Sequence, residues 1–548
     1  MKTMTEKKTE QKSEVETSEV SPDDIIEELG GCGPFQIRLS LIVHLIKTVV
    51  CFSVNTLVLF SATPNWFCAN DELIGNISSC FDNLDGNNES ERLCADAEKQ
   101  CNVNKSTKCS TYEYDDYSIS TFTGEFNLVC GNDFIPSTIS SINIVGLLLG
   151  NLAGGQLADL YGRKPTFYAS IVLLMLFHLL AYFAQSWQVF AVAMFFTGVG
   201  NGFFLTVQYA ILSEYSLSRC RVWMVGFPSW PLQTSLLALC AYLLHDWRNV
   251  ELLIAMMAIP ALMTWFVVPE SFRWHVGHND IKKAQKIVIK VAECNKREHV
   301  KVNIEKLRDQ SKQDDGGYKK YTFLQLFKTW EMAKVTLLLM LDWGSLDIIS
   351  YGIYFGIQTL SGNMYMNIFL FSIVGIPSKF LAIYLQNRFG RRTTTLLCYA
   401  ITAVTSLTVG VVQTIEPVNK DSLANGFAMV ASASISATWG PLQTMTLEMY
   451  PTVIRNIGFG SLSVVGKISA VIGPQLVYLN SYVSGLLYYV CGALSLLSAV
   501  GTLFLPETKG LKLQDKIEQS NKDDNNTSTE NIPKLANVES EMNVQTKF

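Results

Sequence analysis

Twelve apolar stretches of about 20 residues alternate with polar segments along this chain. A helix of this length crosses the hydrocarbon core of a membrane, which is roughly 30 Å thick. The pattern therefore predicts an all-α membrane protein with twelve transmembrane helices. The spans are expected at residues 39–61, 137–158, 166–186, 188–211, 222–244, 249–268, 334–355, 365–386, 394–414, 424–446, 456–478 and 483–505.

The spans form two groups of six, which defines the predicted domains. The first span follows 38 mostly polar residues, so we expect a signal anchor rather than a cleaved signal peptide. The C-terminal tail is polar with few aromatic residues and is expected to be disordered. The predicted domains are an N-terminal segment (1–38), a first six-helix half (39–268) with a long loop (62–136), a linker (269–333), a second half (334–505) and the tail (506–548).

The charges beside the spans predict the orientation, because Lys and Arg are retained on the cytoplasmic side. Lys and Arg gather at Arg163-Lys164, at Arg391-Arg392 and in residues 273–334, so these segments are expected inside the cell. Loop 62–136 has four Lys or Arg against thirteen Asp or Glu and is expected outside. An even number of spans then places both termini in the cytoplasm of a multi-pass plasma-membrane protein.

The long loop 62–136 also has the composition of an extracellular segment. Asn76, Asn88 and Asn104 each begin an Asn-x-Ser/Thr sequon and are candidate glycosylation sites. Six cysteines suit an oxidising compartment and up to three disulfides, whose pairing the sequence leaves open. These candidates are Cys68, Cys80, Cys94, Cys101, Cys109 and Cys130.

Three motifs recur in register in the two halves, which predicts an internal duplication. Each motif lies just past span 2, 4 or 6 and again just past span 8, 10 or 12. The recurring pairs are Gly162-Arg163-Lys164 with Gly390-Arg391-Arg392, Glu214 and Arg221 with Glu448 and Arg455, and Pro269-Glu270-Ser271 with Pro506-Glu507-Thr508.

Together these features resemble the major facilitator superfamily and, within it, the organic ion transporters of the solute carriers, which handle organic cations, carnitine and organic anions. The resemblance covers about residues 30–512. It implies two six-helix halves that rock about a substrate site near the midplane. It rests on the cysteine-rich loop, Gly154–Pro165, Pro269-Glu-Ser-Phe-Arg-Trp274, Glu448-Met-Tyr-Pro-Thr-Val-Ile-Arg-Asn456 and Leu505-Pro-Glu-Thr-Lys-Gly510.

The repeated charged residues are predicted to form an inner gate that breaks when the halves open inward. The alternative is that they only hold these loops in the cytoplasm. The gating candidates are Asp159, Arg163, Glu214, Arg221, Arg391, Glu448 and Arg455. In span 2, the glycines Gly146, Gly150, Gly154 and Gly155 are expected to allow a close helix approach.

Five ionisable residues inside the spans are candidates for function, because a charge at membrane depth is costly. They are Lys47, Asp342, Asp347, Lys379 and Lys467. By the resemblance, Lys467 falls where cation transporters have an Asp and anion and carnitine transporters a basic residue. Lys379 falls where anion transporters have a pocket lysine. We therefore expect Lys467 and Lys379 to bind an anionic group; an Asp347–Lys379 ion pair would leave Lys467 as the main unpaired cation.

Aromatic and polar residues complete the predicted substrate site, because aromatic rings suit varied amphiphilic ligands. Trp230, Tyr351, Tyr354 and Trp439 are the aromatic candidates, with Asn55 and Gln208 as hydrogen-bonding partners and Asp347 as site residue or structural partner. Simple packing in the membrane is the alternative for each ring. Pro228, Pro231 and Pro441 are expected to break helices beside the cavity.

The sequence lacks a phosphate-binding loop and any metal-ligand spacing, so we expect no enzyme activity, catalytic residue, cofactor, metal or nucleic-acid partner. The function predicted is alternating-access transport of small organic ions across the bilayer, with organic anions favoured. An organic cation or carnitine-like zwitterion transporter is the alternative, followed by a sensor that does not transport. A counter-transported ion stays open as a further partner.

Overall fold

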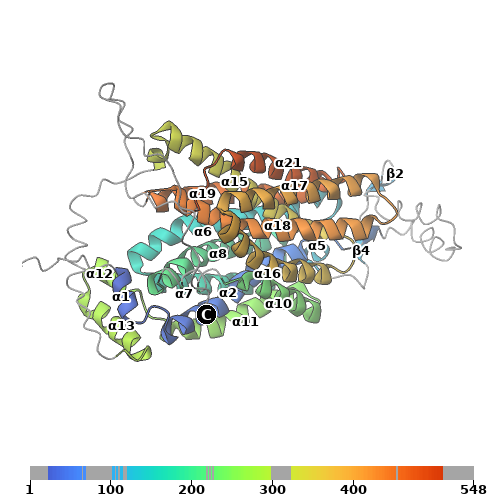
Figure 1. The fold of residues 1–548 in the computed structure, drawn as a ribbon. Helices are drawn as coiled ribbons and strands as arrows, with labels where there is room; N and C mark the ends of the chain where they lie inside the picture. The colour runs from blue at the N-terminus through green and yellow to red at the C-terminus, as the bar shows by residue number, and fades with distance from the viewer. Residues whose placement is uncertain are drawn as a thin grey trace, which may run out of the picture.

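The computed structural model is a bundle of long helices that run side by side (Figure 1). It describes residues 22–64, 66–68, 102–104, 107–108, 112–114, 120–217, 220, 224, 227–297, 323–451 and 454–509. Within these ranges, nine helices are long and apolar enough to cross a membrane. The shorter apolar helix α10 and the long helices α15 and α18 complete the twelve predicted spans.

Six spans make up the first half of the bundle and six the second. The first half contains α2 (Pro34–Phe60), α6 (Ile135–Tyr161), α7 (Arg163–Tyr182), α8 (Trp187–Tyr215), α10 (Ser229–Leu244) and α11 (Trp247–Met263). The second half contains α15 (Trp330–Phe355), α16 (Met364–Phe389), α17 (Arg391–Ile415), α18 (Lys420–Met449), α19 (Arg455–Ala470) with its continuation α20 (Ile472–Asn480), and α21 (Leu486–Leu503). The twelve-helix fold is therefore confirmed.

Short elements mark the two ends of the bundle. The Gly-Arg face, defined by Gly162 and Gly390, has α1 (Pro22–Glu28), α12 (Phe272–Gly277), α13 (Ile281–Cys294) and η4 (Phe323–Phe327) on its side. The opposite Cys-loop face has α5 (Phe122–Glu125), η2 (Cys130–Asn132), η5 (Gly356–Thr359) and two small sheets. Strand β1 (Trp66–Cys68) pairs antiparallel with β4 (Tyr112–Tyr114), and β2 (Asn102–Asn104) pairs with β3 (Thr107–Lys108).

The repeated motifs fold into the same helix cap in both halves. Gly162 has a φ of 108° and Gly390 a φ of 101°, a conformation that favours glycine, and each ends one helix and begins the next. The Glu270 carboxylate then accepts hydrogen bonds from the backbone N–H groups of Arg163 (3.0 Å) and Lys164 (3.1 Å). The Glu507 carboxylate accepts from Arg391 N–H at 2.8 Å. A carboxylate at a helix N-terminus is stabilised by the helix dipole, which explains why both motifs recur together.

Glycines bring α6 and α8 into backbone contact. A Cβ added at Gly146 or Gly150 would strike the carbonyl oxygen of Phe195 or Val199, and one at Gly154 would come within 2.9 Å of Phe203 Cα. The predicted close approach is confirmed at these three positions. At Gly155 a Cβ would meet only a side-chain methyl at 3.7 Å.

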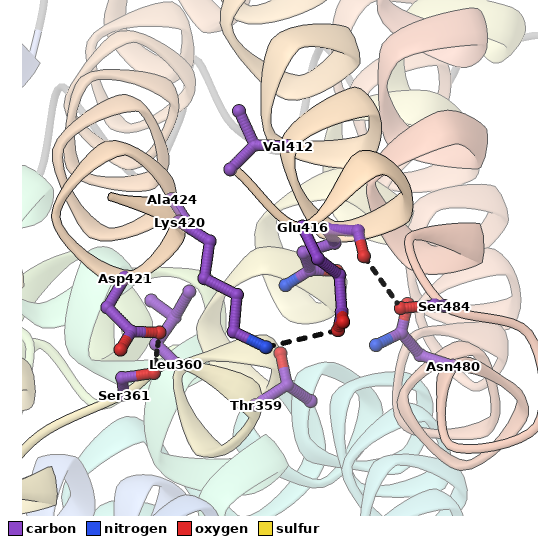
Figure 2. Close-up of a pocket in the computed structure, with 11 residues that line it drawn as sticks. Thr359, Leu360, Ser361, Val412, Glu416, Lys420, Asp421, Ala424, Asn480 and Ser484 are labelled. Atoms are coloured by element: carbon purple, nitrogen blue, oxygen red, sulfur yellow. Dashed lines mark hydrogen bonds and ion pairs between the residues drawn. The ribbon is translucent and has the colours of Figure 1, made fainter. Parts of the chain in front are cut away.

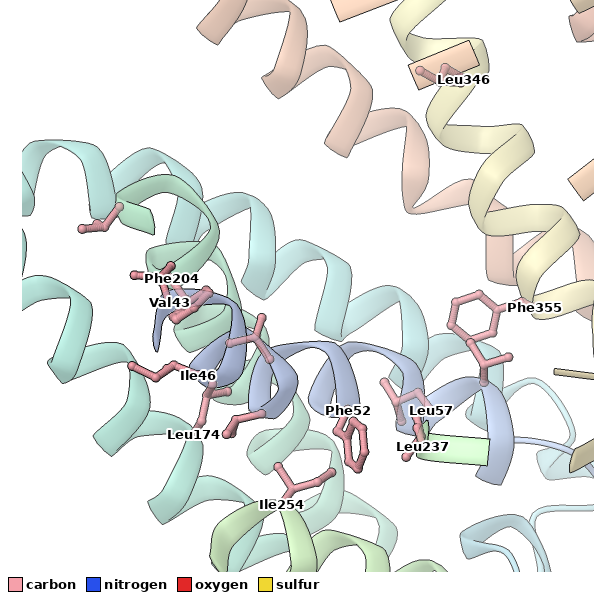
Figure 3. Packing of buried hydrophobic residues seen from close by; sticks show 14 of the residues in the cluster. Val43, Ile46, Phe52, Leu57, Leu174, Phe204, Leu237, Ile254, Leu346 and Phe355 are labelled. Atoms are coloured by element: carbon pink, nitrogen blue, oxygen red, sulfur yellow. The ribbon is translucent and has the colours of Figure 1, made fainter. Parts of the chain in front are cut away.

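Apolar side chains of α2 fill the centre of the first half. Figure 3 shows Val43, Ile46, Phe52 and Leu57 of α2 beside Leu174 of α7, Phe204 of α8, Leu237 of α10 and Ile254 of α11. Proline has a smaller effect on the helices than expected: Pro228 precedes α10 and Pro231 lies in its first turn, whereas Pro441 lies inside α18 without ending it. The predicted break at Pro441 is wrong.

Candidate functional site

The two halves are joined by hydrogen bonds that lie towards the Cys-loop face. Gln358 of η5 donates to Val58 O (3.0 Å) and Ser61 Oγ (2.7 Å) at the end of α2. Ser141 of α6 donates to Val471 O (2.9 Å) and accepts from Gln475 Nε2 (3.0 Å). Tyr482 OH donates to Asp133 Oδ2 at 2.7 Å. The bundle is therefore closed at this face.

At the Gly-Arg face, the repeated charges form ion pairs within each half. Arg163 bonds Asp159 (2.9 Å) and Glu214 (3.0 Å) in the first half, and Arg391 bonds Glu448 (3.0 Å) in the second. Arg455 donates to Tyr450 O at 3.3 Å, and Arg221 lies outside the described residues. These pairs join neighbouring helices of one half, so their role as a gate between halves stays a prediction.

Asp347 of α15 and Lys467 of α19 form an ion pair deep in the second half. Lys467 Nζ donates to Asp347 Oδ1 at 2.6 Å, and the Asp347 side chain is fully buried. Lys467 Nζ also lies 5.4 Å from the ring centres of both Tyr351 and Trp439. The alternative of an Asp347–Lys379 ion pair is therefore wrong, because Lys467 is the lysine that neutralises Asp347.

Lys47 of α2 and Lys379 of α16 are the two cations that remain. Neither has a carboxylate partner within the part of the chain that the structure describes. They come from opposite halves and lie close enough to repel each other electrostatically. Lys47 Nζ lies 5.7 Å from the Trp230 ring centre, a cation–π contact. Together, these four candidate side chains carry three ammonium groups and one carboxylate, a net charge of about two positive.

The other predicted residues divide into half-buried and buried ones. Trp439 is half-buried and donates from Nε1 to Ser350 Oγ at 3.3 Å, and Tyr354 is half-buried on the same helix as Tyr351. Asn55 is buried and donates to Cys51 O at 2.7 Å, which makes it a structural residue of α2. Gln208 of α8 is almost completely buried.

Tyr209 is a site residue that the sequence did not single out. Its side chain on α8 is 47% exposed and interacts electrostatically with Lys467 of the other half. The sequence favoured the adjacent amide, Gln208, because polar residues within spans attract attention and tyrosines do not. Tyr209 therefore links α8 of the first half electrostatically to the Asp347–Lys467 pair of the second.

The Cys-loop face has a separate cavity of about 180 Å³ on the second half, shown in Figure 2. Lys420 and Glu416 form an ion pair there at 3.0 Å, and Ser361 Oγ donates to Asp421 at 2.5 Å. Its lining belongs to the helix ends and loops of this face, so it is distinct from the buried lysines. No group of three or more His, Cys, Asp or Glu in the described ranges is arranged to hold a metal ion.

The disulfide and glycosylation candidates are described only in small part. Cys130 is disulfide-bonded, and the backbones of Cys68 and Asn104 lie in β1 and β2. Cys80, Cys94, Cys101, Cys109, Asn76 and Asn88 lie outside the described residues. The structure also brings Cys32 and Cys220 together on the Gly-Arg face, a contact that the sequence did not predict.

Known proteins with the same organisation define the class of this molecule. A family model described as sugar (and other) transporter matches residues 93–519. The fold is similar to the xylose transporter XylE from E. coli in an inward-open conformation, with a TM-score of 0.61, 15% sequence identity, and coverage of 87% of this chain and 97% of that one. The protein is therefore a multi-pass membrane transporter of the major facilitator superfamily, not an enzyme.

Curated relatives narrow the family further. An organic cation transporter protein of Drosophila melanogaster is 30% identical over 90% of this chain and 94% of its own length. Organic cation/carnitine transporter 2 of Homo sapiens is 29% identical over 74% of this chain and 72% of that protein. Within the superfamily, the chain belongs to the organic ion transporter family of solute carriers.

Proposed function

We propose that this protein carries small organic zwitterions, which combine a carboxylate with an ammonium group, across the plasma membrane by alternating access. The observation that carries the proposal is that Lys47 and Lys379, which belong to opposite halves, have no carboxylate partner within the described ranges and interact electrostatically with each other. A carboxylate between them would relieve their repulsion and join the two halves through charge-assisted hydrogen bonds. The name of the human relative, organic cation/carnitine transporter 2, supports a zwitterion of the carnitine type.

The ammonium end of the substrate would lie near Asp347, Tyr351 and Trp439. The two rings and the carboxylate already hold one ammonium, that of Lys467. Aromatic faces attract quaternary ammonium groups in the same way. Tyr209, Tyr354 and Trp230 would then contact the apolar part of the substrate.

Organic anions without an ammonium group are the second candidate. The net positive charge of the site favours them and opposes a simple organic cation. The two candidate substrate classes are therefore zwitterions and anions, even though several relatives are named as cation transporters.

The orientation is part of the same proposal. The Gly-Arg face would be cytoplasmic with both termini, and the Cys-loop face extracellular, because Lys and Arg concentrate at the former. The closed Cys-loop face then corresponds to an inward-open carrier. The ion pairs at Arg163 and Arg391 would act as inner gates when the halves close at the Gly-Arg face.

Uptake of labelled L-carnitine, p-aminohippurate and tetraethylammonium into cells that express the full chain tests the proposal. We expect L-carnitine to be taken up best and tetraethylammonium least. Lys379→Gln should raise the KM for L-carnitine about tenfold, the loss expected for one charge-assisted hydrogen bond. Tetraethylammonium uptake without L-carnitine uptake would overturn the zwitterion proposal, and p-aminohippurate alone would support the second candidate.

A further inference from the structure

Two cysteines from distant parts of the sequence meet on the Gly-Arg face. Cys32 lies in the turn between α1 and α2, and Cys220 lies in the connection between α8 and α10. Their Cα atoms are 6.1 Å apart, although 188 residues separate them in the sequence. Cysteines form a disulfide when their Cα atoms lie about 4.4–6.8 Å apart. Both side chains are half-buried, so small reagents in the solvent can reach them.

The turn that carries Cys32 is held in place by the end of α13. Asn295 Oδ1 accepts from the Phe35 N–H at 2.9 Å, and Asn295 Nδ2 donates to Leu29 O at 2.7 Å. Gly33 permits this close approach, because a Cβ there would lie 2.5 Å from Asn295 Oδ1. These contacts bring α1 and α13 together at this end of the bundle (Figure 1). Cys32 therefore keeps its position without a bond to another cysteine.

The connection that carries Cys220 is held in place by α2. Met224 O accepts from Ser40 Oγ at 3.1 Å and from His44 Nε2 at 2.9 Å. Ser229 Oγ lies 3.0 Å from the other ring nitrogen of His44. The part of the connection that follows Cys220 is thus anchored on α2, and Cys220 itself faces the turn before that helix. Separate sets of hydrogen bonds therefore hold the two thiols within reach of each other.

We propose that Cys32 and Cys220 are a reversible thiol–disulfide site that responds to peroxide in the cytosol. One thiolate attacks hydrogen peroxide, which gives a sulfenic acid and one water after protonation. The second thiolate attacks that sulfur, forms the S–S bond and releases the other water. The two thiols lose two electrons and two protons, and a cytosolic dithiol returns them by exchange. The reversibility rests on the proposed cytoplasmic position of this face, where glutathione keeps thiols reduced.

The position of Cys32 favours the reactive thiolate form. Cys32 directly precedes Gly33, the N-cap of α2, where the helix dipole stabilises a negative charge. Arg297 adds a positive charge nearby, with Nε 3.9 Å from the place that a Cβ at Gly30 would take. Cys294 is a free, half-buried thiol on the same face, but it is the last residue of α13, where the dipole disfavours a thiolate. Cys294 therefore serves as the matched control.

The disulfide would act on the predicted inner gate. Cys220 directly precedes Arg221, a gating candidate. The counterpart of Arg221 in the second half, Arg455, donates to Tyr450 O at 3.3 Å. A bond from Cys220 to Cys32 restricts the movement of the neighbouring Arg221 when the Gly-Arg face closes. We therefore expect the oxidised carrier to cycle more slowly, a step that rests on the proposed function and on the predicted gating role.

Mass spectrometry of the full chain tests the site directly. The purified protein is treated with hydrogen peroxide, alkylated and digested without reduction. We expect a fragment that links Cys32 to Cys220, at about tenfold or more the amount of any linked fragment that contains Cys294, because neighbouring thiols have a high effective concentration. Dithiothreitol should remove the linked fragment, and Cys32→Ser should abolish it. Cys294→Ser should leave it unchanged.

Uptake of L-carnitine by liposomes that contain the full chain tests the effect on the gate. Peroxide should slow uptake by the wild type about threefold or more, and dithiothreitol should restore it. Cys220→Ser should take up L-carnitine at the same rate before and after peroxide. Cys294→Ser should respond to peroxide as the wild type does.

The outcomes separate this inference from the proposed function. If peroxide oxidises Cys294 but yields no fragment that links Cys32 to Cys220, the site is overturned. A link that is already complete in unstressed cells overturns its reversibility, and a link that leaves uptake unchanged overturns its effect on the gate. If the reduced wild type does not move L-carnitine, the proposed function fails, and the linked fragment still decides whether the thiol–disulfide site exists.

Discussion

Two buried pairs of ionisable side chains in the described part of the chain, one in each half, differ in what surrounds them. His178 of α7 and Glu251 of α11 bond each other and continue into a chain of hydroxyl and amide groups on α2 and α8. Asp347 and Lys467 are flanked by two aromatic rings, and Lys467 remains 14% exposed. The first environment is closed by protein on all the sides that these contacts describe, whereas the second has two aromatic rings beside a partly exposed ammonium group. Similar pairs thus differ in what can reach them.

The largest effect is expected when one member of the Asp347–Lys467 pair is removed. Lys467→Met leaves a fully buried carboxylate without its partner, so we expect the free energy of unfolding to fall by about 3–5 kcal/mol. Thermal unfolding of the purified protein and its surface expression measure this loss. The double variant Asp347→Leu, Lys467→Met should recover stability but not L-carnitine uptake; full uptake in the double variant would exclude the pair from the site.

A smaller effect is expected at the pair in the first half. Ser53→Ala removes the hydroxyl between His178 and Asn201, which should cost about 1–3 kcal/mol of stability because two buried groups lose a partner. Binding of L-carnitine at a fixed pH should be unchanged, since Ser53 is buried away from the lysines. A large rise in the L-carnitine Kd with unchanged stability would contradict the separation of the two pairs.

A still smaller effect is expected at the two aromatic rings beside Lys467, which only the Asp347–Lys467 pair has. Tyr351→Leu and Trp439→Leu each remove one ring 5.4 Å from Lys467, so each should raise the KM for L-carnitine by about 3–30-fold, the value of a partly desolvated cation–π contact. Uptake kinetics for L-carnitine and p-aminohippurate measure this. A rise for L-carnitine but not for p-aminohippurate is the expected pattern, because only the zwitterion has an ammonium group.

The smallest effect is expected at an ion pair that is exposed to solvent, unlike the two buried pairs. Lys420 and Glu416 form an ion pair on the Cys-loop face with side chains 47% and 63% exposed. Lys420→Gln should change stability by less than about 1 kcal/mol and leave uptake unchanged. It therefore serves as the matched control for Lys379→Gln, and a transport defect in Lys420→Gln would show that loss of any lysine charge impairs this protein.

The twelve-helix fold could be predicted from the sequence because its signals are local. Each span is a continuous apolar stretch, and the Gly162 and Gly390 turns need only their own glycine and a capping carboxylate close in space. The pairing of Asp347 could not be predicted, since Lys379 and Lys467 are both lysines within spans and the sequence does not show which span packs on α15. In the structure α19 packs along α15 and turns Gly466 and Lys467 towards Asp347, and a Cβ at Gly466 would collide with the carboxylate.

The His178–Glu251 pair was missed for a related reason. Glu251 falls in the third position of the expected span 249–268, where a charge at the membrane surface is ordinary. The helix instead begins at Trp247, whose ring packs against that of Phe190, and the carboxylate is buried. Only the assembled packing of α2, α7, α8 and α11 shows that it has a histidine partner 73 residues earlier in the chain.

A structure of the carrier with L-carnitine bound would show whether the two lysines bind the substrate. We expect the substrate carboxylate to lie within hydrogen-bonding distance of both Lys47 Nζ and Lys379 Nζ, with the ammonium group facing Tyr351 and Trp439. A carboxylate bound to Lys467 alone, or an ammonium group placed between Lys47 and Lys379, would contradict this expectation.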